Sequence, residues 1–387
     1  MAQGASARIA AIMTMDIQAP LALIGGLSPA QFMRRHWQKK PLLVRQAWPG
    51  VQPPLGRAAL FDLAAQDDVE SRLVQRRADG RWAVRQGPMP RRALPPVARP
   101  DWTLLVQGLD LHEPAAHAML SRFRFVPDAR LDDLMVSWAS DGGGVGPHLD
   151  SYDVFLIQAQ GRRRWRVGPP PRRPAWVEGA PLKLLDGFEP THDWLLEPGD
   201  MLYLPPLWGH DGTAVGGDCI TCSVGFRVPA AGELARELLV RMAEVDEPAS
   251  ALYRDPAQPA TASPAAVPAA LEAFARDALH RQLADPLALP RALGEVLTEP
   301  KPRVWFEAGE DAGGALRLDV ATRMMYDSRH LFINGESFLA SGRDARLLRG
   351  FADARHLPAA DRSRLSAPAQ ELVGDWVAAG WCHGDER

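Results

Sequence analysis

Two histidines and one aspartate in this sequence have the types and spacing of a metal-binding set. His148 and Asp150 are separated by one residue, so on an extended strand both side chains leave the same face. His210 follows a turn signal at residues 197–200 and a short apolar run at residues 201–204. Two imidazoles and one carboxylate make the facial triad, which binds iron(II) on one side and leaves positions open for a co-substrate and dioxygen. The sequence therefore predicts an iron centre at these side chains.

A run of arginines follows the predicted triad. Residues 152–158 have the pattern of a buried strand, and residues 161–167 have the pattern of its antiparallel partner. In the second segment Arg163 shares a face with Trp165 and Val167, whereas the other arginines of the run fall on the opposite face. A buried guanidinium needs an anionic partner, and its fork suits a carboxylate. No acidic residue of the run can serve, so we favour a bound dicarboxylate over a structural ion pair.

Other polar residues near the predicted triad are candidates for handling a substrate. Tyr152 has the parity of His148 and Asp150, so we expect it to face the same cavity and to position substrate or co-substrate. An ordinary core tyrosine is the alternative. Asp141 and Asp153 are candidates for pairing with a cationic substrate side chain.

In combination, these motifs resemble those of the JmjC ribosomal oxygenases. The matching stretches are residues 146–155, 161–168 and 197–206, followed by the histidine at 210. The likeness runs from about Leu27 to the C-terminus. It points more specifically to the bacterial branch that hydroxylates an arginine of a large-subunit ribosomal protein.

The resemblance implies a double-stranded β-helix that uses Fe(II) and the co-substrate 2-oxoglutarate. By position, the predicted triad matches the iron ligands of the family, and Arg163 matches the arginine that grips the distal carboxylate of 2-oxoglutarate. Ser137 and Ser223 stand where the family places polar cavity residues. The implied activity is hydroxylation of the β-carbon (C3) of an arginine in the L-sixteen protein. The alternatives are hydroxylation of another residue such as histidine, a metal cupin of different chemistry, and a non-catalytic ribosome-assembly factor.

The predicted fold is mainly β with helical additions, in three parts. Residues 1–229 are expected to form the catalytic domain with its N-terminal helices. Residues 230–300 carry helical patterning, where the family has a dimerisation module; helices that pack within one chain would explain the pattern equally well. Residues 301–387 are expected to form a winged-helix-like domain. From residue 342 to the end there are seven arginines and seven acidic residues, so assembly is favoured over DNA binding.

Composition sets the remaining expectations. The 387 residues carry a formal net charge of −3, which gives no general attraction to nucleic acid or to an anionic membrane. No apolar run reaches the roughly 18 residues of a membrane span, and the N-terminus lacks a secretion signal. Three cysteines fit buried thiols in a reducing compartment. We therefore expect a cytoplasmic protein.

Local signals place several elements. Ser28 and Gln31 have the spacing of a capping box, for a helix expected to end near Lys40. Residues 69–77 and 81–86 flank a hairpin signal, and Asn334-Gly335 predicts a two-residue turn between strands.

Overall fold

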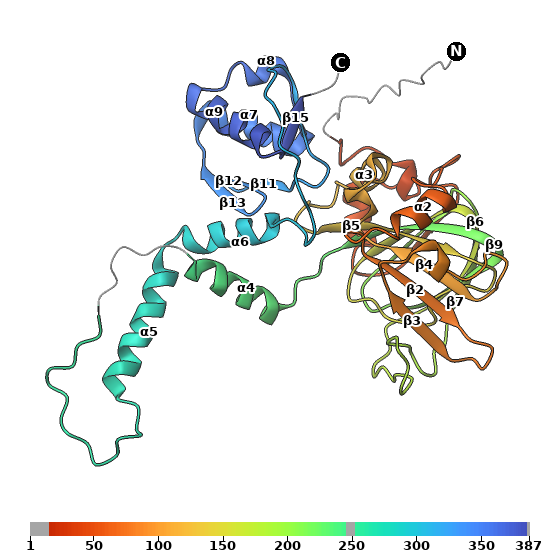
Figure 1. Cartoon of the computed structure of the whole chain (residues 1–387), viewed down its shortest axis with the longest axis horizontal. Helices are drawn as coiled ribbons and strands as arrows, with labels where there is room; N and C mark the ends of the chain where they lie inside the picture. Colours follow the sequence, from red (N-terminus) through yellow and green to blue (C-terminus); the bar gives the residue numbers. More distant parts are fainter. Residues whose placement is uncertain (1–14, 245–251, 385–387) are drawn as a thin grey trace. The chain divides into compact units, whose positions relative to one another are not determined.

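The structure is a computed structural model that describes residues 15–244 and 252–384. It divides into two compact units, and Figure 1 shows the course of the chain through both. The first unit contains Met1–Val228 and Pro302–Trp305; the second contains Pro229–Lys301 and Phe306–Arg387.

The first unit is rich in strands. In chain order these are β1 (Leu42–Val44), β2 (Ser71–Arg76), β3 (Trp82–Gln86), β4 (Trp102–Val106), β5 (Leu131–Ala139), β6 (Val154–Gly168), β7 (His192–Leu196), β8 (Met201–Leu204) and β9 (Gly209–Phe226). The helices of this unit are short: α1 (Pro29–Arg35), α2 (Arg57–Leu63) and α3 (Pro114–Ser121), with 3₁₀ turns η1 (Ala22–Ile24), η2 (Arg91–Ala93) and η3 (Leu109–Leu111). The expected hairpin of β2 and β3 is confirmed.

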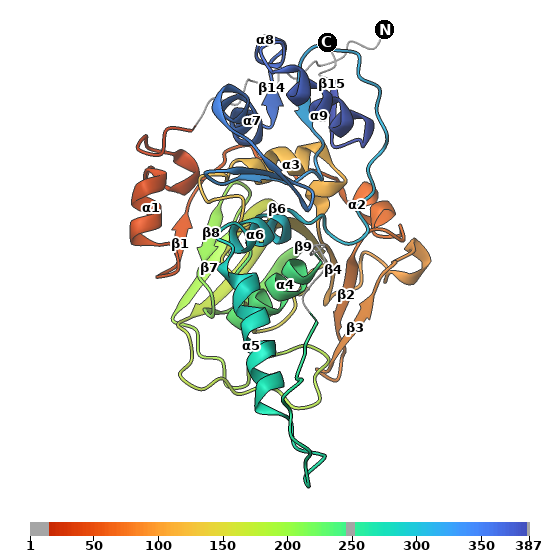
Figure 2. The same ribbon diagram turned by 90° about the vertical axis from the view of Figure 1, so that its left-hand side faces the viewer.

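All nine strands belong to one antiparallel sheet. Its order is β1-β8-β6-β9-β5-β4-β2-β3, and β7 also pairs with β6. The long strands β6 and β9 pair along most of their length, while β8 takes the first half of the other edge of β6 and β7 takes the second half. Figure 2 shows this curved arrangement of strands. The prediction of a mainly β fold is confirmed.

The expected hairpin between residues 152–158 and 161–167 is wrong, because residues 154–168 form the single strand β6. The register with β9 shifts between Gln158 and Arg162, which marks a bulge. Within it Gly161 has a φ of +65°, and an added Cβ there would lie 3.0 Å from the Asp218 carbonyl oxygen. One extra residue with a left-handed glycine bends a strand, whereas a hairpin needs a loop of two or more residues. The chain therefore kinks here and continues in the same direction.

The N-terminal helix joins the aromatic core of the first unit. The predicted capping box is confirmed, since Ser28 and Gln31 each accept a hydrogen bond from the other's backbone N–H. The helix α1 ends at Arg35, so the expected end near Lys40 is wrong; a turn occupies the residues between them. Phe32 is fully buried, and this burial ties α1 to the sheet.

The second unit combines helices with two small sheets. Its helices are α4 (Ala231–Ala243), α5 (Ala269–Ala284), α6 (Ala288–Thr298), α7 (Gly342–Ala354), α8 (Ala359–Arg362) and α9 (Ala367–Ala378). Its strands are β10 (Leu316–Leu318), β11 (Met324–Tyr326), β12 (His330–Ile333), β13 (Glu336–Leu339), β14 (His356–Leu357) and β15 (Cys382–Gly384), in the sheets β14-β10-β15 and β11-β12-β13.

The turn predicted in this unit is present in the structure. The Asn334-Gly335 turn is confirmed, because it joins β12 to β13 with Ile333 paired to Glu336 and both turn residues at positive φ. Helices α4 and α6 pack together, as Figure 2 shows. Among the residues that the structure describes in either unit, no helix is long and apolar enough to cross a membrane.

Candidate metal centre and its cavity

A short backbone bridge brings the two predicted histidine ligands together. His148 and His210 exchange both backbone hydrogen bonds, with N–O distances of 3.0 and 3.1 Å. Residues paired in this way project their side chains from the same face, and the two ring centroids lie 4.2 Å apart. His148 makes this isolated bridge outside any named strand, so the strand expected through residues 148–150 is reduced to one bridging residue.

Hydrogen bonds fix how the two imidazoles face Asp150. Nδ1 of His148 lies 2.9 Å from the carbonyl oxygen of Gly146, and Nδ1 of His210 lies 2.9 Å from that of Trp208. A carbonyl oxygen only accepts, so each Nδ1 carries a proton and each ring turns its Nε2 toward the carboxylate. Burial by itself would lower the pKa of His210, but the hydrogen bond to Asp150 and the charge of that carboxylate raise it, so a bound metal would displace the proton from its Nε2. The Nε2 atoms lie 3.8 and 3.4 Å from the Asp150 carboxylate.

The three side chains form a compact donor set. Their ligand atoms all lie within 4.8 Å of one another. Burial, and next the charge of His210, lower the pKa of His148 to about 4, so this ring is neutral near pH 7. Burial by itself would raise the pKa of Asp150, but hydrogen bonds and the neighbouring histidines lower it to about 2. Two imidazole nitrogens and a carboxylate suit a divalent transition metal.

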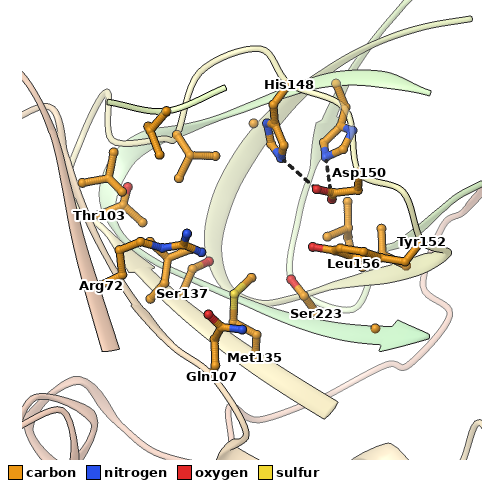
Figure 3. Close-up of a pocket in the computed structure, with 18 of the residues that line it drawn as sticks. Arg72, Thr103, Gln107, Met135, Ser137, His148, Asp150, Tyr152, Leu156 and Ser223 are labelled. Atoms are coloured by element: carbon orange, nitrogen blue, oxygen red, sulfur yellow. Dashed lines mark ion pairs between the residues drawn. The ribbon is translucent and has the colours of Figure 1, made fainter. Parts of the chain in front are cut away.

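A cavity of about 350 Å³ opens beside this donor set. Figure 3 shows His148, Asp150 and Tyr152 at one side of it, and Arg72, Thr103 and Ser137 at the other. The cavity wall includes side chains from β2, β4, β5, β6 and β9, and it combines apolar residues with many polar and charged ones. Its polar and charged side chains are Arg72, Thr103, Gln107, Asp132, Asp133, Ser137, His148, Asp150, Tyr152, Arg163, Trp165, Lys183, His210 and Ser223.

Arg163 points into this cavity from β6. Its side chain is buried at 4% exposure, whereas Arg162 and Arg164 are exposed, so the predicted alternation holds. Nη1 donates to the hydroxyls of Ser137, at 3.0 Å, and Thr221, at 3.2 Å, while Nε has no hydrogen-bond partner. No carboxylate among residues 15–244 and 252–384 forms an ion pair with it. A buried cation of this kind is suited to an anionic ligand.

The structure places the other predicted residues as follows. Tyr152 lines the cavity beside Asp150, although it precedes β6 and does not belong to the strand. Ser223 lines the cavity, but the hydroxyls that hold Arg163 are those of Ser137 and Thr221.

The structure places both predicted acidic partners of a cationic substrate outside the cavity, and the burial of Asp153 contradicts the prediction for that residue. Asp141 accepts a hydrogen bond from the backbone of Gly216 and does not line the cavity. Asp153 is fully buried and accepts hydrogen bonds from Tyr203 and Gln38. Asp132 and Asp133 line the cavity instead. Residues 132 and 133 begin β5, and only the pairing of that strand brings them to the cavity.

Several cavity residues were missed by the sequence analysis. Thr221 could have been found, because it has the strand parity of Ser223. Arg72 and Thr103 carry no such signal, since they lie on β2 and β4, far from the triad in the chain. Their place in the cavity depends on the order of strands in the sheet.

The chain matches two families of known domains. Residues 118–234 match the JmjC domain, and residues 275–383 match the ROXA-like winged helix. The first match contains every predicted metal ligand, together with Arg163. The second covers most of the described helices and strands after α5, which confirms the expected winged-helix-like region.

Curated and solved proteins extend these matches. The chain is 42% identical over 240 residues to the ribosomal protein uL16 3-hydroxylase of Escherichia coli strain K12, covering 61% of this chain and 62% of that protein. The aligned part thus spans less than two thirds of this curated relative. The crystal structure of E. coli YcfD is 31% identical with a TM-score of 0.78, covering 91% of this chain and 97% of that one. A ribosomal oxygenase structure of YcfD in complex with cobalt and 2-oxoglutarate has a TM-score of 0.75 at 31% identity, covering 92% and 98%.

Proposed function

This chain belongs to the JmjC ribosomal oxygenases, and from that premise we propose that it is an Fe(II)- and 2-oxoglutarate-dependent protein hydroxylase. Its proposed substrate is an arginine of the large-subunit ribosomal protein uL16, hydroxylated at C3. The name of the E. coli relative supports the substrate, and the cobalt and 2-oxoglutarate complex of YcfD supports the cofactor and co-substrate.

The proposal rests on one observation: the cavity contains both the three metal-binding side chains and a buried arginine, Arg163, that has no acidic partner among the described residues. His148, Asp150 and His210 would hold the iron, because their ligand atoms converge within 4.8 Å and both histidines present Nε2. Arg163 would hold the distal carboxylate of 2-oxoglutarate through its free Nε–H and its guanidinium fork. Ser137 keeps that guanidinium in place.

When bound, iron(II) and 2-oxoglutarate supply a dioxygen-dependent oxidation that converts a C–H bond to C–OH and the co-substrate to succinate and carbon dioxide. The protein's part is to bind, orient and exclude water. Tyr152 lines the cavity beside Asp150, where its hydroxyl would help to fix the carboxylate's orientation. Asp132 and Asp133 give one wall of the cavity acidic character, which suits the guanidinium of a substrate arginine.

The rest of the chain has proposed roles in assembly. We assign dimerisation to residues 230–300, where α4 and α5 carry exposed apolar side chains at Leu239, Val240, Leu279 and Leu283. The winged-helix part, residues 301–387, is proposed to serve assembly without direct DNA binding, because its charges are balanced over its last helices. With a ribosomal protein as substrate, we propose that the chain acts in the cytoplasm.

The test is turnover on the proposed substrate. Purified protein, Fe(II), 2-oxoglutarate and a uL16 fragment should give succinate and a peptide that gains one oxygen atom at a single arginine, located by mass spectrometry. The Asp150→Asn variant should give neither product. Succinate formation with modification of a histidine in place of arginine would refute the arginine assignment, and absence of iron-dependent succinate release would refute the enzyme class.

A further inference from the structure

We propose that Arg72, on β2, is a second cationic residue of the co-substrate pocket, where it assists Arg163 in holding the distal carboxylate of 2-oxoglutarate. The inference rests on the proposed function and adds a binding residue to it. Arg72 lies outside the segment, residues 118–234, that matches the JmjC domain. It therefore connects the strands that precede the matched domain to the binding of the co-substrate.

The sheet register places Arg72 in line with the groups that hold Arg163. Arg72 is opposite Leu105 on β4, Leu105 is opposite Ser137 on β5, and Ser137 is opposite Thr221 on β9. Residues paired across neighbouring strands share a face of the sheet. The two hydroxyls that accept from Arg163 thus occupy the same row as Arg72.

The distance along this row suits a long side chain. Arg72 and Ser137 are two strands apart, which corresponds to roughly 10 Å between their backbones. Only Leu105 separates them in the row. Figure 3 shows the Arg72 side chain extending toward the part of the cavity that contains Ser137. A carboxylate bound to Arg163 would therefore lie within reach of both guanidinium groups.

Arg72 has no ion-pair partner among the residues that the structure describes. Arg72 is half-buried and lines the cavity, yet no carboxylate in the described part of the chain forms an ion pair with it. Arg76, on the same strand, is exposed and stacks over Trp82 with 6.0 Å between its guanidinium carbon and the ring centroid. Two cavity-lining arginines without ion-pair partners favour an anion as the ligand beside them.

An unsatisfied hydroxyl on the neighbouring strand supports the same ligand. Thr103 is fully buried and lines this cavity, and its Oγ1 has no hydrogen-bond partner. It lies two residues before Leu105 on β4, on the same face of the strand, and on the side of the cavity that holds Arg72. Burying a hydroxyl without a partner is costly, so a ligand oxygen that accepts from Thr103 would remove that cost.

The experiment measures binding without turnover. The protein is loaded with zinc, which does not support the oxidation, and its affinity for 2-oxoglutarate is determined by calorimetry. Arg72→Ala should weaken binding about tenfold to a hundredfold, the range for a lost hydrogen bond to a charged group. Arg72→Lys should recover part of the loss, since it keeps the charge but not the fork. Arg76→Ala is the matched control on the same strand and should bind as the unmodified chain does.

Thr103→Val gives an independent test of the site, because it removes the hydroxyl and keeps the size and shape of the side chain. If the hydroxyl serves the ligand, Thr103→Val binds 2-oxoglutarate more weakly while its thermal unfolding is unchanged or occurs at higher temperature. Arg72→Gln replaces Arg72→Ala should the alanine variant unfold early, and it should also bind more weakly.

The outcomes separate this inference from the proposed function. Weaker binding in the Arg72 variants and in Arg163→Ala, with Arg76→Ala unchanged, supports both. Weaker binding in Arg163→Ala alone overturns the role of Arg72 and leaves the proposed function in place. If Arg163→Ala binds 2-oxoglutarate as tightly as the unmodified chain does, the proposed co-substrate site is overturned, and the inference about Arg72 is overturned with it. Equal weakening in Arg72→Ala and Arg76→Ala shows a general effect of surface charge and overturns the inference.

Discussion

Replacing Arg163 by alanine is expected to raise the apparent KM for 2-oxoglutarate by roughly two to nearly four orders of magnitude. Arg163 is 4% exposed and has no acidic partner within the described ranges, so its charge is available to the ligand. Removing one member of a buried charge pair costs about 3–5 kcal/mol. At about 1.4 kcal/mol per factor of ten, this is roughly a 100-fold to 5000-fold loss of affinity.

Arg163→Ala should affect the stability of the fold less than it affects the binding of 2-oxoglutarate. Within the protein, Arg163 donates only to the hydroxyls of Ser137 and Thr221, and its Nε is unpartnered. Losing these two bonds should lower the free energy of unfolding by about 1–3 kcal/mol. Circular dichroism at the assay temperature should therefore report a folded variant. If the variant is folded, a raised KM for 2-oxoglutarate reports the loss of Arg163 from the binding site.

The matched control is Arg164→Ala, one residue further along the same strand. Arg164 pairs with Asp193 at 3.3 Å on the surface, and both side chains are about half exposed. Such a pair contributes under about 1 kcal/mol, so the KM should change less than about fivefold. The assay is succinate formation as 2-oxoglutarate is varied at saturating substrate. Equal shifts at 163 and 164 would refute the inward orientation of Arg163 as the basis of co-substrate binding.

Three further predictions concern the metal, pH and assembly. His148→Ala should lower iron stoichiometry, measured by metal analysis after desalting, whereas His112→Ala should leave it unchanged; equal iron in both variants would contradict the ligand assignment. Burial alone would raise the pKa of Asp200, but two backbone N–H groups and an arginine lower it. Its folded pKa is thus below the unfolded value, so its stabilisation is fully present above about pH 4 and is lost as pH falls through the folded pKa. Asp200→Asn should accordingly reduce the free energy of unfolding by about 1–3 kcal/mol at pH 7 and by less under acid, as measured by urea denaturation; a constant difference would refute the linkage. Full-length chain should be dimeric by light scattering, and Leu239→Asp with Val240→Asp on exposed α4 positions should make it monomeric; a monomeric unmodified chain would exclude the dimer.

Short-range patterns in the sequence were sufficient for some of the local elements. The capping box of Ser28 and Gln31 depends on backbone groups three residues apart, and the Asn334-Gly335 turn depends on residues that accept positive φ. The inward face of Arg163 follows from alternation within a few residues of one strand. These features require no knowledge of the rest of the fold. The pairing of His148 with Asp150 was predicted from a strand that the structure reduces to one bridging residue, so the residues were correct but the local reason was not.

Only the tertiary structure decided which distant strands meet around the cavity. The sequence shows two apolar segments separated by Gly161, and an antiparallel hairpin accounts for them as well as a bulged strand does. Pairing with β9 selects the bulge, because β9 supplies hydrogen bonds along both halves of β6. Arg72 is brought level with Ser137 through β4, across more than sixty residues of chain. The order of the strands depends on how side chains from many strands and helices pack together, so no local pattern in the sequence encodes it.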